Sequence, residues 1–85
     1  MEITDIIVRK YFSSGPLYAV VTVILDGAIA IHDIKAAKKP DGRLIAVMPA
    51  RTDAFGRSRD VVHPVNDSFR QSLERAIAKK LNVYQ

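Results

Sequence analysis

The sequence has 85 residues, of which 48% are apolar and 26% charged, as expected for a folded globular domain rather than a disordered chain. It contains no cysteine, which excludes disulfides, thiolate zinc sites and cysteine nucleophiles. The formal net charge is +4, and because the two signs balance over residues 1–42, the whole excess lies in residues 43–85. A basic half of a small domain favours a polyanionic partner, and a solvated basic surface is the alternative.

The N-terminal residues lack the basic and apolar segments of a signal peptide, and the longest apolar run, residues 17–25, is too short to cross a bilayer. We therefore expect a cytoplasmic protein with no membrane partner, formed of one domain over residues 1–85. A chain of this length buries only about 60–65% of its unfolded surface. Since the folded monomer is then marginal, we expect a homodimer.

Glycine-containing turns divide the first part of the chain into predicted strands at residues 2–10, 17–25, 28–37, 43–48 and 58–63. The Asp26-Gly27 pair between two apolar runs predicts a tight hairpin turn with positive φ at both residues. The strand at 17–25 is apolar on both faces, so we expect it to be central, with a helix over one face and a partner chain over the other.

The last segment predicts a helix that begins after Asn66, a favourable N-cap, with Asp67 adding negative charge to the first turn. Arg70 and Glu74 are spaced to form an ion pair on its surface. One apolar stripe recurs every fourth residue, at Phe69, Leu73, Ile77 and Leu81. The sequence thus predicts an α+β fold: an antiparallel sheet of about five strands with a C-terminal helix packed on it, dimeric through the sheet.

Two histidines, His32 and His63, have an aspartate within three residues, Asp33 and Asp60. A His–Asp pair can act as a general base or supply two metal ligands. Neither pair has a third partner at a recognisable spacing, and Asp60 and His63 would point to opposite faces of one strand. There is also no glycine-rich nucleotide-binding loop. We therefore expect both histidines to be structural hydrogen-bonding residues at strand positions, and no metal, cofactor or small-molecule substrate.

Three arginines, Arg51, Arg57 and Arg59, surround the Phe55-Gly56 turn. The planar, bidentate guanidinium suits phosphates and guanine edges, although an ordinary solvated hairpin is an equal alternative. Phe55 could stack on a base or wedge between base steps. We expect it instead to fold back onto the core.

The predicted helix offers a second basic surface. Ser68 and Gln71 lie near its N-terminus, where phosphates bind well and short polar side chains can contact base edges. A charged stripe on an amphipathic helix is more often simply its solvated face. The basic residues of this segment are Arg70, Arg75, Lys79 and Lys80.

Short motifs follow one another along the chain: Met1-Glu2-Ile3-Thr4-Asp5-Ile6, Ile31-His32-Asp33-Ile34-Lys35, Ala46-Val47-Met48-Pro49 and Arg59-Asp60-Val61-Val62-His63-Pro64-Val65-Asn66. In this order and spacing they resemble the stage V sporulation protein G (SpoVG) family, over residues 1 to about 80. The resemblance implies a cytoplasmic, nucleoid-associated bacterial regulator that dimerises through its sheet, binds double-stranded DNA and, in some members, RNA, and is not an enzyme. It links the chain to septation, sporulation and gene regulation. It also implies that DNA is read around the start of the C-terminal helix, here residues 67–72.

This chain departs from the family pattern at the turn between the last two predicted strands. Members usually carry Pro-Asp-Gly there, whereas this chain has Ala54-Phe55-Gly56, followed by Arg57 in place of a common acidic residue. The turn is therefore more basic than is usual in the family.

We weigh three hypotheses. In the first, the protein is a DNA-binding regulator, with phosphate contacts from Arg51, Arg57, Arg59, Arg75 and Lys79 and base readout by Ser68, Arg70 and Gln71. In the second, it is a protein-interaction module that acts in septation without binding nucleic acid. The third and weakest is a small metal-dependent or hydrolytic enzyme that uses the two His–Asp pairs.

Overall fold

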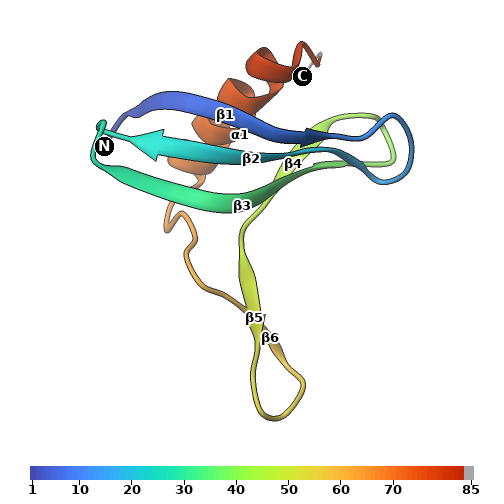
Figure 1. The fold of residues 1–85 in the computed structure, drawn as a ribbon, viewed down its shortest axis with the longest axis vertical. Coiled ribbons are helices and arrows are strands. Elements are labelled where there is room, and N and C mark those ends of the chain that lie inside the picture. The colour runs from blue at the N-terminus through green and yellow to red at the C-terminus, as the bar shows by residue number, and fades with distance from the viewer. Residues whose placement is uncertain (84–85) are drawn as a thin grey trace.

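Residues 1–83 form a four-stranded antiparallel sheet, a separate two-stranded ribbon and one C-terminal helix (Figure 1). This computed structural model describes residues 1–83. The strands are β1 (Ile3–Tyr11), β2 (Leu17–Leu25), β3 (Ile29–Lys38), β4 (Leu44–Val47), β5 (Ala50–Thr52) and β6 (Ser58–Asp60), and the helix is α1 (Asp67–Leu81). The main sheet has the order β1-β2-β3-β4, so the predicted α+β class is confirmed.

The predicted sheet of about five strands is corrected to four. The segment predicted as a fifth strand, residues 58–63, is extended only at Ser58–Asp60, and it pairs with the unpredicted β5 instead of the main sheet. Pro49 supplies a reason, because a residue without a backbone N–H cannot continue the ladder of β4. Met48, just before it, is buried in the core while the chain turns away.

The β2–β3 turn has the predicted geometry, with φ of 53° at Asp26 and 60° at Gly27. The Ala28 N–H donates to the Leu25 carbonyl at 2.9 Å and closes the turn. The start of β1 is bonded to the same turn, since the Gly27 N–H donates to Thr4 Oγ1 at 2.9 Å. These bonds fix β1 beside β2 and leave β2 in the interior of the sheet.

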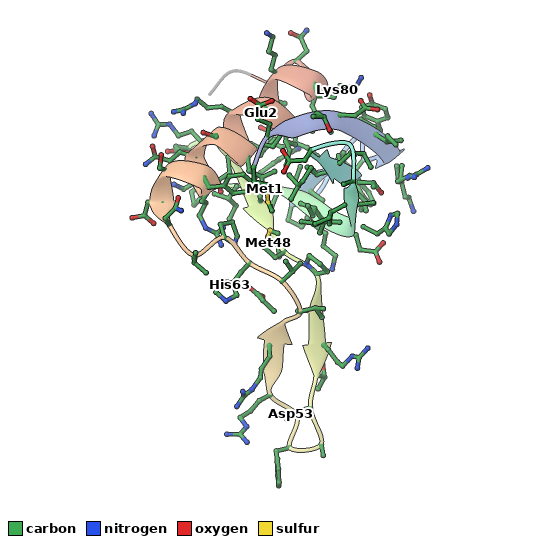
Figure 2. The ribbon with its side chains drawn as sticks, turned by 90° about the vertical axis from the view of Figure 1, so that its left-hand side faces the viewer. Met1, Glu2, Met48, Asp53, His63 and Lys80 are labelled. Atoms are coloured by element: carbon green, nitrogen blue, oxygen red, sulfur yellow. The ribbon has the colours of Figure 1, made fainter. Side chains whose placement is uncertain are left out.

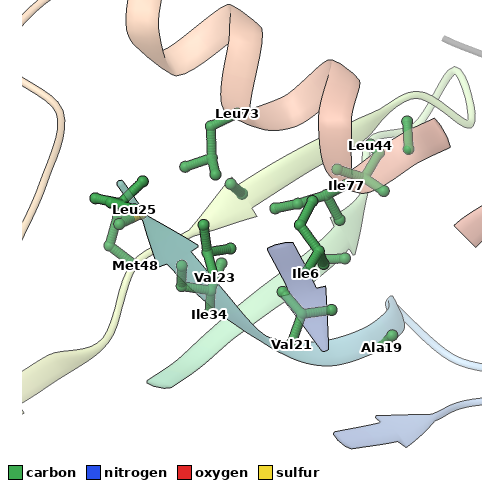
Figure 3. Close-up of a cluster of buried hydrophobic side chains, with 13 residues drawn as sticks. Ile6, Ala19, Val21, Val23, Leu25, Ile34, Leu44, Met48, Leu73 and Ile77 are labelled. Atoms are coloured by element: carbon green, nitrogen blue, oxygen red, sulfur yellow. The ribbon is translucent and has the colours of Figure 1, made fainter. Parts of the chain in front are cut away.

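The core lies between one face of the sheet and α1 (Figure 3). Val21 and Val23 of β2 and Ile34 of β3 point toward Leu73 and Ile77 of the helix, and all five are buried. Burying side chains of this size contributes roughly 1.5–3 kcal/mol each. The helix therefore covers one face of the predicted central strand, as expected.

Both ends of α1 are capped by asparagine. The Asn66 side chain accepts a hydrogen bond from the Phe69 N–H at 2.7 Å, which confirms the predicted N-cap. Asn82 adopts a left-handed conformation with φ of 61° and ends the helix after Leu81. The helix therefore ends where the apolar stripe ends.

The start of α1 does not cover the whole end of the sheet and leaves a hollow of about 350 Å³. Its walls are mainly apolar, and Met1, Met48 and His63 on its lining are labelled in Figure 2. His63 is exposed in the linker 61–66, outside any strand, so its predicted strand position is wrong. Its Nδ1 lies 3.1 Å from the Pro64 carbonyl oxygen.

No element of residues 1–83 covers the second face of the main sheet, which faces the viewer in Figure 1 with α1 behind. Thr22 points to this face, yet it is only 1% exposed, because two neighbours cover its hydroxyl. Arg9 Nε donates to Thr22 Oγ1 at 3.2 Å, and His32 Nδ1 lies 3.0 Å from the same oxygen. His32 thus has the structural hydrogen-bonding role expected for it.

Candidate nucleic-acid interface

Residues 50–60, here called the arm, form a ribbon that projects from the body of the molecule (Figures 1 and 2). Strands β5 and β6 pair only with each other, and the Val61 N–H closes the base by donating to the Pro49 carbonyl at 2.8 Å. All arm residues are exposed except Asp53, which is half-buried. The arm therefore presents nearly all of its side chains to a ligand.

Asp53 organises the tip of the arm. Its Oδ1 accepts hydrogen bonds from the Phe55 N–H at 2.8 Å and the Arg57 N–H at 2.9 Å. Gly56 has φ of 79°, a conformation that glycine adopts without strain, and its N–H donates to the Asp53 carbonyl at 3.1 Å. An aspartate followed three residues later by glycine is typical of such turns. The tip is therefore a defined turn.

The three predicted arginines of the arm lie together. Arg51 and Arg59 are directly opposite each other in the β5–β6 register. Arg57 Nε lies 3.4 Å from Asp53 Oδ2, and Arg59 Nε lies 3.9 Å from the same oxygen. Exposed ion pairs of this kind are worth about 0.2–1 kcal/mol, so they are easily exchanged for contacts with another anion. Arg51 forms no ion pair with any residue of 1–83.

Phe55 is 82% exposed, so the expectation that it folds back onto the core is wrong. The physical reason is the direction of the short ribbon, which carries its tip away from the sheet (Figure 2). The only ring contact described for Phe55 is with the Arg57 guanidinium, whose carbon lies 5.3 Å from the ring centroid.

The predicted helical residues divide into two groups. Ser68, Gln71, Arg75 and Lys79 are all exposed, and their spacing places them on one side of α1. They form the second group of cationic and polar side chains, here called the helix stripe. The helix stripe and the arm belong to separate elements, which the linker 61–66 joins.

Arg70 lies on the opposite side, toward the sheet, and is half-buried. Its Nη1 donates to the Ala46 carbonyl at 3.3 Å, and Glu74 Oε2 accepts from the Ala46 N–H at 3.0 Å. The predicted Arg70–Glu74 ion pair is therefore absent, because both side chains bind the backbone of the edge strand β4 instead. Arg70 contacts neither the arm arginines nor the helix stripe in the bonds described for it.

Sequence reasoning missed two features of the arm, namely the organising role of Asp53 and the exposure of Phe55. The Asp53–Gly56 spacing could have indicated the first. The exposure of Phe55 depends on which strand pairs with β6, and no local sequence pattern shows that pairing.

Among residues 1–83, no three His, Asp or Glu side chains lie close enough together to hold a metal ion. Within the same part of the chain, no helix is long and apolar enough to cross a membrane.

Comparison with known proteins identifies the family. The SpoVG family model matches residues 1–83. The chain is 40% identical over 77 residues to a protein of Desulforudis audaxviator, covering 91% of this chain and 86% of that protein. It is 42% identical over 80 residues to one of Acetivibrio thermocellus, covering 94% and 84%. A protein of Clostridium novyi is 37% identical over 83 residues, covering 98% and 82%. Each of these relatives carries the name "Putative septation protein SpoVG". The chain therefore belongs to the SpoVG family.

Proposed function

We propose that this SpoVG family member is a DNA-binding regulatory protein that acts as a homodimer in septation and sporulation and catalyses no reaction. The role in septation rests on the names of its relatives. The observation that carries DNA binding is the position of the basic excess. It lies largely on exposed side chains of the arm and the helix stripe.

The proposed contacts with DNA are of two kinds, with phosphates and with base edges. Phosphate contacts come from Arg51, Arg57 and Arg59 of the arm and from Arg75 and Lys79 of the helix, because guanidinium and ammonium groups neutralise backbone charge. Readout of base edges comes from Ser68, Gln71 and Arg70 at the start of α1. Arg70 can contribute only through the part of its guanidinium not bonded to Ala46. RNA is the second candidate ligand.

The open face of the main sheet is the proposed dimer surface. Ile7, Val20 and Ile24 are half-buried there, with no helix above them. The uncovered face of an antiparallel sheet is normally polar, so these three apolar side chains favour a second protein layer. In the dimer the basic surface is doubled, and we expect the protein to be associated with the nucleoid.

The direct test is fluorescence anisotropy of a labelled DNA duplex titrated with the protein at several salt concentrations. Each neutralised phosphate should contribute about −0.9 to the slope of log affinity against log salt. Exchanging Arg57 and Arg59 for glutamate should abolish most of the binding, whereas Lys80→Gln should change it little. Unchanged affinity in the double variant would contradict the proposal.

A second candidate function is supported by apolar side chains near the base of the arm. Val61 is 65% exposed and Val65 is 88% exposed, and both lie in the linker 61–66 that leads to α1. Such side chains suit a protein partner in septation, with no role for nucleic acid. Recovery of a stoichiometric partner that survives nuclease treatment, together with no binding to DNA or RNA at low salt, would favour this alternative.

A further inference from the structure

We propose that the arm enters the major groove of B-form DNA tip first, with Phe55 against the bases and Arg51 and Arg59 along the groove. This inference rests on the proposed function and names the groove and the groups that the arm would contact. Three observations carry it: the dimensions of the ribbon, its opposed arginines and its exposed aromatic tip.

The ribbon has the right size for the major groove. At about 3.4 Å per residue, the stretch from Ala50 to Asp53 extends roughly 10 Å, enough to reach the floor of a groove about 8.5 Å deep. Two paired strands lie about 4.8 Å apart, and their side chains widen the ribbon to roughly the 12 Å of the major groove. The minor groove, about 6 Å wide, is too narrow for it.

The opposed arginines favour an anionic environment. Arg51 and Arg59 face each other across β5 and β6, and like charges in directly opposite positions destabilise a strand pair. The Asp53 carboxylate, 3.9 Å from Arg59 Nε, offsets part of this repulsion, but Arg51 has no such partner within residues 1–83. The ribbon also has no buried core that would offset the rest, since its strand residues are all exposed. Phosphates along the groove walls, or guanine edges on its floor, would remove the repulsion by binding both guanidinium groups.

The tip presents an apolar group that the free protein leaves in water. Phe55 is held by the Asp53 carboxylate through its N–H, so the ring projects from a defined turn. Arg57 lies over the ring, which places a cation beside the same contact point. Thymine offers its C5 methyl group in the major groove, and aromatic side chains contact this methyl. The tip therefore fits thymine-containing sequences.

Groove entry also predicts discrimination between DNA and RNA. The major groove of an A-form RNA duplex is deep and narrow, and side chains cannot enter it. An arm that works in this way binds a DNA duplex more tightly than an RNA duplex of the same sequence. Arg75 and Lys79 of the helix stripe, which contact only phosphates in this proposal, would bind both duplexes.

The experiment compares three duplexes: alternating adenine–thymine DNA, the same DNA with deoxyuridine for thymine, and the matching RNA. Deoxyuridine lacks only the methyl group. Affinities would be measured by anisotropy for the wild type, Phe55→Ser, the Arg51→Gln/Arg59→Gln double variant and the control Lys80→Gln. Because the arm lies outside the core, unfolding curves should show that all variants are folded.

For the wild type and Lys80→Gln we expect deoxyuridine to weaken binding about fourfold, as for loss of one buried methyl group. Phe55→Ser should bind the two DNAs equally, and the double arginine variant should lose the preference for DNA over RNA. Equal binding of all three duplexes by the wild type, or competition by a minor-groove ligand such as netropsin, would overturn groove entry and leave DNA binding intact. A wild type that binds none of them at low salt would contradict both proposals.

Discussion

Asp53 has two roles at the tip of the arm, and exchanging one of its carboxylate oxygens for an amide nitrogen separates them. Its Oδ1 accepts two backbone N–H groups, and its Oδ2 lies within 4.0 Å of Arg57 and Arg59. An asparagine retains an oxygen that can accept both hydrogen bonds but carries no charge. The turn and the neutralisation of the arginines can therefore be tested independently.

We expect Asp53→Asn to keep the tip folded and to raise DNA affinity. An exposed ion pair is worth about 0.2–1 kcal/mol, so DNA affinity should rise up to about fivefold and depend more steeply on salt. Anisotropy titrations would measure both the affinity and its salt dependence. Asp26→Asn removes the same charge from the β2–β3 turn and should have a smaller effect. Lower affinity in Asp53→Asn with an intact turn would show that the arm arginines do not contact the ligand.

Glu74 is expected to be a structural residue despite its place on a charged helix. Its carboxylate accepts the N–H of Ala46, which is buried on the edge strand β4. Removing the only described partner of a buried donor costs about 1–3 kcal/mol. Glu74→Ala should therefore lower the free energy of unfolding by that amount in urea denaturation, whereas Arg75→Ala, on the exposed helix stripe, should change it by less than about 0.5 kcal/mol. Equal effects in the two variants would contradict the role given to Glu74.

At the scale of elements, those with a strong local signal could be predicted from the sequence. The Asp26-Gly27 pair marks a turn by its own backbone preference, and Asn66 followed by an apolar stripe marks the helix. Strand β5 could not be predicted, because three exposed residues carry no alternation of apolar and polar side chains. Its pairing with β6 is a consequence of Pro49 ending the ladder of β4, a tertiary effect.

The candidate site was predictable to a similar extent. The arm arginines are close in sequence, so their clustering follows from any hairpin between them. Arg70 was assigned with the polar side of the helix, but it lies between Ile77 and Leu81 around the helix axis and faces the sheet. Phe55 was expected in the core because an aromatic side chain is usually buried, whereas no core lies within reach of the tip.

Helix α1 is expected to supply much of the stability of the fold. Ile77 is completely buried against the sheet, and the surrounding side chains cannot collapse fully into the space it occupies. Ile77→Ala should therefore lower the free energy of unfolding by about 2–5 kcal/mol. Urea denaturation would measure the change, with Val65→Ala, at 88% exposed, as the control. If Ile77→Ala lowers the free energy of unfolding by less than the control does, the helix is not packed as described.

At the scale of the whole molecule, the two faces of the main sheet have different environments. The helix covers one face and supplies the core, while the other face carries the half-buried Ile7, Val20 and Ile24, which no element of residues 1–83 covers. The arm projects away from both (Figures 1 and 2). A dimer formed through the open face would therefore leave both arms free to bind.

Val20 offers the sharpest test of that dimer. It lies on the open face, directly opposite Lys10 on β1 and Lys35 on β3. A glutamate at this position would have a cationic neighbour on each side, so the folded monomer should tolerate it. In a dimer, however, the same carboxylate would be buried at an apolar contact, where an unpaired charge costs several kcal/mol. Val20→Glu should therefore give a folded monomer in sedimentation analysis, while the wild type and Val65→Glu remain dimeric.

Because one monomer carries half of the basic surface, the DNA affinity of Val20→Glu should fall and the salt dependence of its binding should become shallower. A dimeric Val20→Glu variant would show that the dimer contact lies elsewhere. A monomeric wild type would show that the open face is not a dimer interface.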